Sequence, residues 1–550
     1  MWTACFFVFS AGMLLPPALA VTNELVVFSS HGTPAPAVGT NLYVYTGSTN
    51  IDCYVADSPV TNGTEKYACT GWTGTGSVSP GSGTNVTVTL TNDSVIAWQW
   101  QTNYTLTAIA ASSNGVVTAS NGWYSSGSTA VVEAAGVEPG YMFSGWLGDV
   151  PSSNASDNPL SLVMDQSRSV TAVFDTVVYV SPAGSHQSPF STWATAATNI
   201  QAAVNVASNG MFVLVSNSVY VVSDPLQVTT GLTVRSVNGS GVTVIEEDGG
   251  DGRCVELGAG SVLEGFTIRN GNVSAGVGTN RYGFAGYWGG GVFLDMGGEL
   301  RDCVVTSCQA EKGGGVYCYR GGTLHGCIVS GNTATTAGYT GQGGGIFVDS
   351  NAVIRSSLVV SNTSDRGGGI RCDDGGEILS STISTNNARM YGGGIYLDSG
   401  GTVRNSIIYF NTAGVSEDNY RNAGSGQYYA YSCTEPAISG PHNGGDNISG
   451  DPLFVDRTNG VWILTPGSAC VDAGLNAGWM NDETDVAGTN RVLNGTVDMG
   501  AYEYVPPMIA SSSGENGSIS PSGTYYTFTN TNGVETVSVT YGSSLTYNMT

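Results

Sequence analysis

The sequence predicts an all-β chain whose centre is a right-handed parallel β-helix, and three repeated features predict it. A glycine triplet followed by Val or Ile recurs five times, a second apolar step follows each triplet, and a third step ends in Asn. The triplets begin, at spacings of 24, 30, 24 and 25 residues, at Gly289, Gly313, Gly343, Gly367 and Gly392. Three short strands in every ~24 residues form one coil of a three-sided solenoid, whose coils stack at ~4.8 Å.

The recurring positions explain how successive coils hold together. The second apolar step is occupied by Leu300, Leu324, Ile354, Ile378 and Val403. The third step ends in Asn332, Asn362, Asn386 and Asn411, with Cys308 at the equivalent place in the first coil. Apolar residues in register stack into buried columns, and stacked Asn amides form a ladder of hydrogen bonds between coils. The glycine runs permit positive φ at a tight corner.

The β-helix is predicted to span 176–505 and to be closed at both ends. An amphipathic helix at 192–207 precedes the first strand and would cover the first coil, which blocks edge-to-edge stacking. Residues 451–504 form the closing segment at the far end. Six extra residues within 334–342 and a longer insertion at 271–288 are predicted to be loops at the corners.

Small β modules are predicted on both sides of the β-helix. Residues 22–105 carry short alternating runs, typical of strands with one face in solvent. Residues 106–175 carry a different set of landmarks, and 511–550 are predicted to be the start of a second, truncated copy. The landmarks are Pro139-Gly140-Tyr141-Met142-Phe143-Ser144-Gly145-Trp146, Gly148-Asp149, Asn158-Pro159, Met164 and Val170-Thr171-Ala172-Val173-Phe174.

These landmarks, in this order, resemble the divergent internalin B-type repeat, a small β-grasp-like module of bacterial surface proteins. The closing segment, with Val497-Asp498-Met499-Gly500-Ala501-Tyr502-Glu503-Tyr504, is similar to that of the "choice-of-anchor Q" family of surface β-helices. The GGGI and Asn landmarks are similar to the repeats of the adhesin-like chlamydial polymorphic outer-membrane proteins. The resemblances imply a β-helix at a bacterial surface and leave its activity open.

The first twenty residues predict export. Residues 5–15 are apolar and precede Ala18-Leu19-Ala20, the small-x-small pattern that a signal peptidase cuts. We therefore expect a signal peptide at 1–20 and a secreted, extracellular or outer-membrane-surface protein of a bacterium. No later apolar run approaches the ~20 residues that span a bilayer, so no transmembrane segment is expected.

The charge of the chain limits its partners. The sequence has 17 basic and 42 acidic residues, a net charge of −25. Because phosphate-backbone binding needs a broad basic face, nucleic acid is not expected as a partner. Polysaccharides, or glycans and proteins of a host or cell surface, suit this composition better. Ca²⁺ is the one cofactor left open.

Ten cysteines follow the predicted leader, and export makes disulfides available to them. Cys53 with Cys69, and Cys433 with Cys470, each bracket a loop-rich segment without another Cys. These are the two pairs to test first. No CxxC motif or Cys/His cluster has the spacing of zinc ligands.

Aligning the coils by their triplets creates a column of acidic residues. Its members are Asp295, Tyr319, Asp349, Asp373 and Asp398. Stacked carboxylates repel, so the column indicates either solvent screening or a bound cation. Asp349, Asp373 and Asp398, with Asp374, could supply oxygens to Ca²⁺, which takes six to eight. Three of these Asp residues also precede Gly or Ser at a corner, where Asx-turns favour Asp without a metal.

Polysaccharide lyases and polygalacturonases also use right-handed β-helices, so an enzyme is the alternative to a binding protein. A lyase needs a base beside a uronate and a cation or Arg that neutralises its carboxylate. Arg371 with Asp373 and Asp374 is the best candidate trio, although an Arg beside acids is more often their screening partner. We assign no catalytic residue, because neither a Gly-His-Gly segment nor a Ser-His-Asp set can be identified.

Aromatic residues crowd two predicted loops. The candidates for ligand contact are Tyr282, Tyr287, Trp288, Tyr428 and Tyr429. Aromatic faces stack on sugar rings or anchor protein contacts; alternatively, they pack as cover over the side of the β-helix. We predict a modular surface protein that acts in adhesion or glycan binding without catalysis. A polysaccharide lyase or glycoside hydrolase of the pectate-lyase-like class is the alternative.

Overall fold

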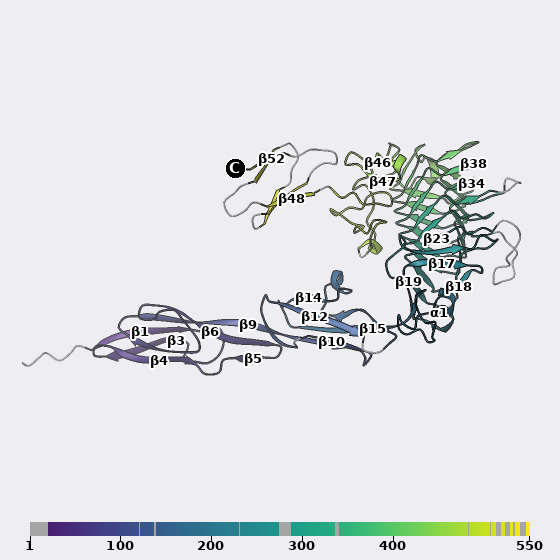
Figure 1. Cartoon of the computed structure of the whole chain (residues 1–550). Coiled ribbons are helices and arrows are strands. Elements are labelled where there is room, and N and C mark those ends of the chain that lie inside the picture. Colours follow the sequence, from purple (N-terminus) through teal and green to yellow (C-terminus); the bar gives the residue numbers. More distant parts are fainter. Residues whose placement is uncertain are drawn as a thin grey trace, which may run out of the picture. The chain divides into compact units, whose positions relative to one another are not determined.

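The chain forms two compact units, Met1–Phe174 and Asp175–Thr550. They are coloured along the sequence in the computed structural model of Figure 1. The structure describes residues 20–549 except 120, 137–138, 230, 274–287, 336–339, 482, 507, 513–518, 523–527, 532–533 and 539–545. The predicted signal peptide therefore lies outside the described residues up to residue 19. No helix in the described part is long and apolar enough to cross a membrane.

The first unit begins with a β module whose alternating strands bury one face. In β4, Ile51, Cys53 and Val55 point into a core with Trp72 and Trp98, while the residues between them face solvent. The strands of this module are β1 Val21–Phe28, β2 Pro34–Ala35, β3 Gly39–Tyr45, β4 Thr49–Val55, β5 Val60–Asn62, β6 Glu65–Thr75, β7 Gly81–Ser82, β8 Asn85–Leu90 and β9 Ser94–Ala110.

The second module of this unit has its own core, built on the landmark residues. Trp146 and Met164 are buried there. The Trp146 indole donates to the Asp157 carbonyl at 2.8 Å, and the Asn158 amide pairs with the backbone of Ala134. The elements are β10 Gly115–Thr118, β11 Gly122–Ser125, β12 Thr129–Gly136, β13 Tyr141–Gly148, η1 Ser152–Asn154, β14 Leu160–Val163 and β15 Arg168–Val180. The expected boundary at 105/106 falls inside β9, because this one strand pairs in both modules.

The second unit is a right-handed parallel β-helix, which confirms the fold predicted from the sequence. Three parallel sheets run along its sides. The first contains, after the end of β15, β16 Phe212–Val215, β19 Thr233–Ser236, β22 Val262–Glu264, β25 Glu299–Arg301, β28 Thr323–His325, β32 Val353–Arg355, β36 Glu377–Leu379, β40 Thr402–Arg404 and β44 Tyr428–Ala430.

The other two sheets complete each coil. The second contains β17 Ser218–Val222, β20 Thr243–Glu247, β23 Thr267–Arg269, β26 Val304–Thr306, β29 Ile328–Ser330, β33 Leu358–Val360, β37 Thr382–Ser384, β41 Ile407–Tyr409 and β45 Cys433–Thr434. The third contains β18 Leu226–Val228, β21 Val255–Leu257, β24 Val292–Asp295, β27 Val316–Tyr319, β31 Ile346–Ser350, β35 Ile370–Asp374, β39 Ile395–Ser399 and β43 Tyr420–Asn422. A short corner sheet holds β30 Thr333–Ala334, β34 Thr363–Arg366, β38 Asn387–Tyr391 and β42 Thr412–Ala413.

Each glycine of the repeated triplet is required for its own reason. The first has φ between 62° and 67° in all five triplets, a conformation that glycine adopts without a steric penalty. A Cβ on the second would lie 2.4 Å from a carbonyl of the next coil, as at Gly344. A Cβ on the third, as at Gly345, would lie 2.9 Å from the Asn362 amide nitrogen.

The buried Asn column carries hydrogen bonds between coils. The Asn362 Oδ1 accepts from both the backbone N–H and the Nδ2 of Asn332, at 2.9 and 3.0 Å. The Asn362 Nδ2 donates onward to Asn386 Oδ1 at 3.0 Å and back to the Val329 carbonyl at 2.9 Å. Asn386 and Asn411 repeat this pattern, which continues to Asn419. Each amide therefore contacts both neighbouring coils.

A second polar ladder, which we did not predict, runs between the first and second sheets. Its side chains are Ser357, Ser381, Ser406 and Ser432, each buried. Each Ser hydroxyl accepts from the backbone N–H of the equivalent residue one coil earlier, at 3.2 to 3.3 Å. These Ser residues recur at nearly constant spacing in the sequence, but Ser is so common in this chain that the sequence alone does not distinguish them from the others.

The cap helix is shorter than predicted. The structure has α1 at Ile200–Val206, where we expected 192–207. Asn199 ends the extended chain and caps the helix, its Oδ1 accepting from the Ala202 N–H at 2.8 Å. Upstream, the Ala197 N–H donates to the Tyr179 carbonyl in β15, so this segment is held as an added strand and cannot be helical.

The closing segment packs along the second sheet, whereas the last coil is covered by residues before it: Ile438 joins the core, and Ile448 pairs with Cys433. Trp462 and Ala501 bury Leu358 and Val360 of β33, and Glu483 pairs with Arg355 at 3.1 Å. The elements of this region are η2 Gly440–His442, β46 Phe454–Asp456, η3 Arg457–Asn459, β47 Val461–Leu464 and η4 Gly478–Met480. The last strands are β48 Met508–Ser512, β49 Ile519–Ser522, β50 Phe528–Thr531, β51 Val534–Ser538 and β52 Thr546–Met549.

Candidate functional site

The predicted acidic column lies on the outer side of the third sheet, and Arg371 bridges two of its carboxylates. Arg371 is 6% exposed. Its Nε contacts Asp373 at 2.6 Å, and its Nη2 contacts Asp398 at 2.7 Å. The guanidinium also lies 4.6 Å from the centre of the Tyr396 ring. The expected trio is therefore corrected: Asp398 of the next coil takes the place of Asp374, which is exposed.

The carboxylates of this column do not converge as calcium ligands. Asp349 accepts from the Tyr317 hydroxyl at 3.3 Å, whereas Asp373 and Asp398 are held by Arg371. Burial, followed by the charge of Asp349, raises the pKa of Tyr317, so this hydroxyl stays protonated as a donor. Within the described ranges, no group of three His, Cys, Asp or Glu side chains could hold a metal ion. Arg371 is the positive charge between Asp373 and Asp398, and Ca²⁺ binding at Asp349, Asp373 and Asp398 stays a prediction.

The candidate aromatic residues divide into three cases. Tyr282 and Tyr287 lie outside the described residues. Trp288 stacks on Tyr317 at 5.1 Å, at the end of a column of rings. Tyr428 is 38% exposed, but Tyr429 is wholly buried and donates to Asn422 at 2.9 Å. The prediction for Tyr429 is wrong, because alternation along β44 turns its ring into the core.

The ten described cysteines are present as thiols. Cys433 and Cys470 lie in one buried cluster with their sulfurs in contact. The recorded contacts of Cys53 and Cys69 are with backbone carbonyls, of Ile51 for the first and of Gly71 and Gly83 for the second. The predicted disulfides remain predictions, and the geometry favours Cys433 with Cys470 over the other pair.

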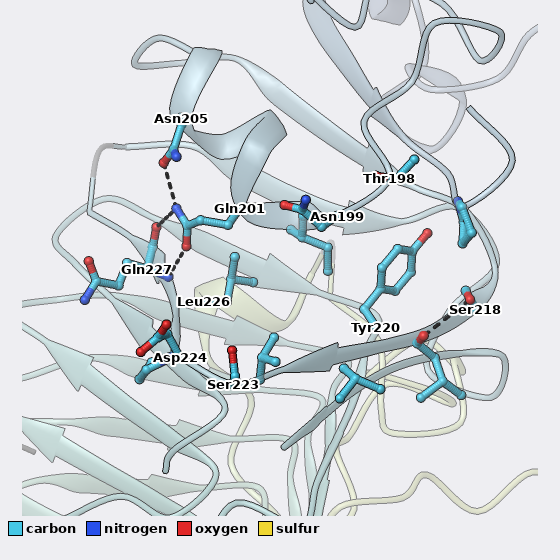
Figure 2. Close-up of a pocket in the computed structure, with 16 residues that line it drawn as sticks. Thr198, Asn199, Gln201, Asn205, Ser218, Tyr220, Ser223, Asp224, Leu226 and Gln227 are labelled. Atoms are coloured by element: carbon cyan, nitrogen blue, oxygen red, sulfur yellow. Dashed lines mark hydrogen bonds between the residues drawn. The ribbon is translucent and has the colours of Figure 1, made fainter. Parts of the chain in front are cut away.

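A groove of about 850 Å³ lies at the first coil, beside the cap helix. We call it the cap groove (Figure 2). The residues that line it are Pro182, Thr198, Asn199, Ile200, Gln201, Asn205, Ser218, Val219, Tyr220, Val221, Val222, Ser223, Asp224, Pro225, Leu226 and Gln227. Helix α1 forms one wall, and β17, β18 and the turn between them form the other. The groove exists because β17 and β18 begin their sheets and have no preceding strand.

A side-chain clamp fixes the shape of the cap groove. Gln201 of α1 accepts from the Gln227 N–H at 2.8 Å and donates to the Gln227 carbonyl at 3.2 Å. The same Nε2 also donates to Asn205 at 2.8 Å, as Figure 2 shows. These bonds join the helix to β18 as a neighbouring strand would. The walls of the groove are thus preorganised.

The polar groups of the cap groove are uncharged amides and hydroxyls, apart from one carboxylate. The lining combines amides and hydroxyls with the exposed apolar Val219 and Val221, and Asp224 is the one charged residue among the described residues that line it. Ser223, Asp224 and Gln227 are exposed, and no hydrogen bond of their side chains is recorded within the described structure. Uncharged donors and acceptors beside apolar surface are the groups that hold a small polar ligand in orientation.

The cap groove was missed in the sequence because its residues do not form a motif. Asn199 is an ordinary N-cap, Gln201 is an ordinary helix residue, and Ser223-Asp224-Pro225 is an ordinary turn. The one available indication was that the first strands of the solenoid must lack a partner on one side. The side chains that gather at this unpaired edge depend on how α1 docks.

The comparisons with known proteins identify one module of the chain. Residues 104–178 match the model of the Divergent InlB B-repeat domain, which confirms the resemblance of that region. No curated protein matches the chain. Among solved structures, pectate lyase Pel9A is similar with a TM-score of 0.33 and 14% identity, covering 60% of this chain and 96% of that one. A pectin methylesterase in complex with a hexasaccharide has a TM-score of 0.30 and 11% identity, covering 50% and 93%.

Proposed function

We propose that this protein is exported, is displayed at a bacterial surface, and binds carbohydrate in the cap groove without catalysing its cleavage. The preorganised groove of amides and hydroxyls carries this proposal. The surface location rests on the predicted signal peptide, on the B-repeat module and on the similarity of the closing segment to surface β-helices. The acidic charge of the chain suits uncharged glycans better than anionic polymers.

The chemical content of the cap groove favours binding over hydrolysis. A glycosidase of the usual kind uses two carboxyl groups on opposite sides of the bond that it cleaves. Asp224 is the one carboxylate of the groove, and neither His, Lys, Arg nor Cys lines it. A lone carboxylate can accept hydrogen bonds from sugar hydroxyls, which are strengthened by its charge.

The enzyme alternative depends on the flank of Arg371. A lyase would use this guanidinium to neutralise a uronate, but Asp373 and Asp398 already occupy two of its edges. Its remaining Nη1 is buried beneath the surface of the described chain. We therefore place the lyase second.

Titration of the full chain with a panel of neutral and uronic oligosaccharides, followed by calorimetry, tests the proposal. We expect Asp224→Ala/Gln227→Ala to weaken the binding of the preferred glycan at least about tenfold, because two hydrogen bonds of about 1 kcal/mol each are lost. Reducing ends and unsaturated products are followed in the same samples, and we expect neither.

The matched control is Asp374→Ala/Asn387→Ala, which also removes one carboxylate and one amide from exposed positions on the β-helix. It should bind as the unmodified chain does. Equal loss of affinity in both variants would show that the cap groove is not the binding site. Release of unsaturated products would instead establish the lyase.

A further inference from the structure

Two cysteines replace residues of the repeat at the first registered coils. Cys254 stands where the later coils have the third glycine, since Val255 pairs with Val292 and the Cys254 N–H donates to the Gly291 carbonyl at 3.1 Å. Cys308 stands at the foot of the Asn ladder, where its N–H donates to Asn332 Oδ1 at 3.0 Å. Each cysteine thus occupies a position for which the rest of the solenoid uses another residue.

A space at Gly271, where the later coils have a ladder Asn, is filled by both sulfurs. Gly271 lies one coil before Cys308, in the place of a ladder Asn, because Ile268 pairs with Val305 in the same register. A Cβ on Gly271 would lie 3.1 Å from the Cys254 Sγ. The Cys254 Sγ contacts the Arg269 carbonyl at 3.2 Å, and the Cys308 Sγ contacts the adjoining Ile268 carbonyl at 4.0 Å. Both sulfurs therefore lie beside the backbone of residues 268–271, where the two thiols are close enough to interact.

We propose that Cys254 and Cys308 form a disulfide that joins two successive coils. Both side chains are buried, at 0% and 2% exposure, in one apolar cluster. The bond would lie at the N-terminal end of the Asn ladder and continue covalently what the amides do by hydrogen bonding. A solenoid opens from its ends, so a covalent bond between its early coils opposes opening there.

The chemistry requires an oxidant of the thiol–disulfide class, such as oxidised glutathione. The thiolate of one cysteine attacks a sulfur of oxidised glutathione, and one glutathione thiolate leaves. The second cysteine thiolate then attacks the mixed disulfide and releases the other glutathione. Two protons and two electrons leave the protein thiols, and one molecule of oxidised glutathione becomes two of the reduced form. Since the interaction with Cys308, followed by burial, raises the pKa of Cys254, we expect the reaction to occur while the chain folds.

Peptide mapping of the full chain, folded in a buffer of reduced and oxidised glutathione, tests this inference. Free thiols are alkylated after denaturation, and the protein is digested with trypsin. We expect peptide 254–269, which contains Cys254 alone, to be recovered joined to peptide 302–312. Recovery of alkylated Cys254 and alkylated Cys308 would overturn the proposal.

Two variants identify the partner, because peptide 302–312 also contains Cys303. Cys303→Ser should retain the joined peptides, and Cys308→Ser should lose them; the opposite result would assign the bond to Cys303. In Cys254→Ser/Cys308→Ser, we expect a melting temperature lower by about 5 °C than that of the oxidised chain. Equal melting temperatures would show that the bond does not stabilise the early coils, and the peptide mapping alone decides whether the bond forms.

Discussion

At the scale of single residues, Arg371 determines what its flank can bind. Its guanidinium bridges Asp373 of its own strand and Asp398 of the next coil while it lies on Tyr396. Lys312 also lies 4.0 Å from Asp373, so two cations compensate the two carboxylates at rung spacing. An arginine in this position screens the stacked carboxylates, and Ca²⁺ binding beside them stays a prediction for the melts described next.

We expect the melting temperature of the unmodified chain to be the same in millimolar CaCl₂ and in EDTA. Arg371→Met should lower the unfolding free energy by about 2 kcal/mol, because it leaves Asp398 without its partner and Asp373 with Lys312 alone. It should also make the stability of the chain calcium-dependent. Thermal melts in both buffers measure this. Arg421→Met is the control, because Arg421 lies one coil beyond Tyr396 at the same position of the third sheet. A calcium response of the unmodified chain would contradict the expectation.

Glu503 of the closing segment is a second residue with a definite physical consequence. Its carboxyl is 1% exposed and lies 3.1 Å from Arg491, with Asp498 and Asp485 close by. Burial raises its pKa to about 8, against the opposing effect of Arg491. The folded chain therefore binds this proton more tightly than the unfolded chain does.

The stabilisation from Glu503 is complete below its unfolded pKa of about 4.5 and is lost as the pH rises through about 8. We expect the unfolding free energy to fall by about 2 to 4 kcal/mol over this range. Urea titrations at several pH values measure the slope. Glu503→Gln, which keeps the shape and removes the titration, should flatten it; an identical slope in both proteins would assign the effect to other groups.

At the scale of elements, the polar ladders fix the register of the coils. The apolar columns of Leu, Ile and Val hold the coils together without direction, since burial of apolar surface has no preferred geometry. Hydrogen bonds, in contrast, do have a preferred geometry. Each ladder Asn has its partners one coil before and one coil after, so slippage by one residue would leave buried amides unsatisfied.

Asn386→Ala should cost about 3 kcal/mol, because it leaves the N–H of Asn362, the Nδ2 of Asn362 and the Val359 carbonyl without their partners. Chemical denaturation compared with the unmodified chain gives this value. The neighbouring Asn387 is exposed, and Asn387→Ala should change stability by less than about 0.5 kcal/mol. Similar costs at the two positions would mean that the ladder contributes little.

At the scale of the whole molecule, the two ends of the β-helix differ. The far end is covered by the chain around Ile438 and Ile448, and the closing segment lies along the second sheet. The first coil is covered by one short helix, and the cap groove lies beside it. The repeated coils between these ends have side chains whose roles stacking explains, so the irregular first coil is where specific recognition would be expected.

The sequence by itself determined the solenoid, because stacking demands the same residue type at the same place in every coil. Glycine triplets, apolar columns and the Asn ladder repeat along the chain, and repetition is visible without coordinates. The B-repeat landmarks were equally visible. Only the tertiary structure decided which carboxylates Arg371 binds, that Tyr429 is buried, that Cys254 meets Cys308, and that a groove lies beside α1. These contacts join residues on different coils or at irregular positions, where no period relates one partner to the other.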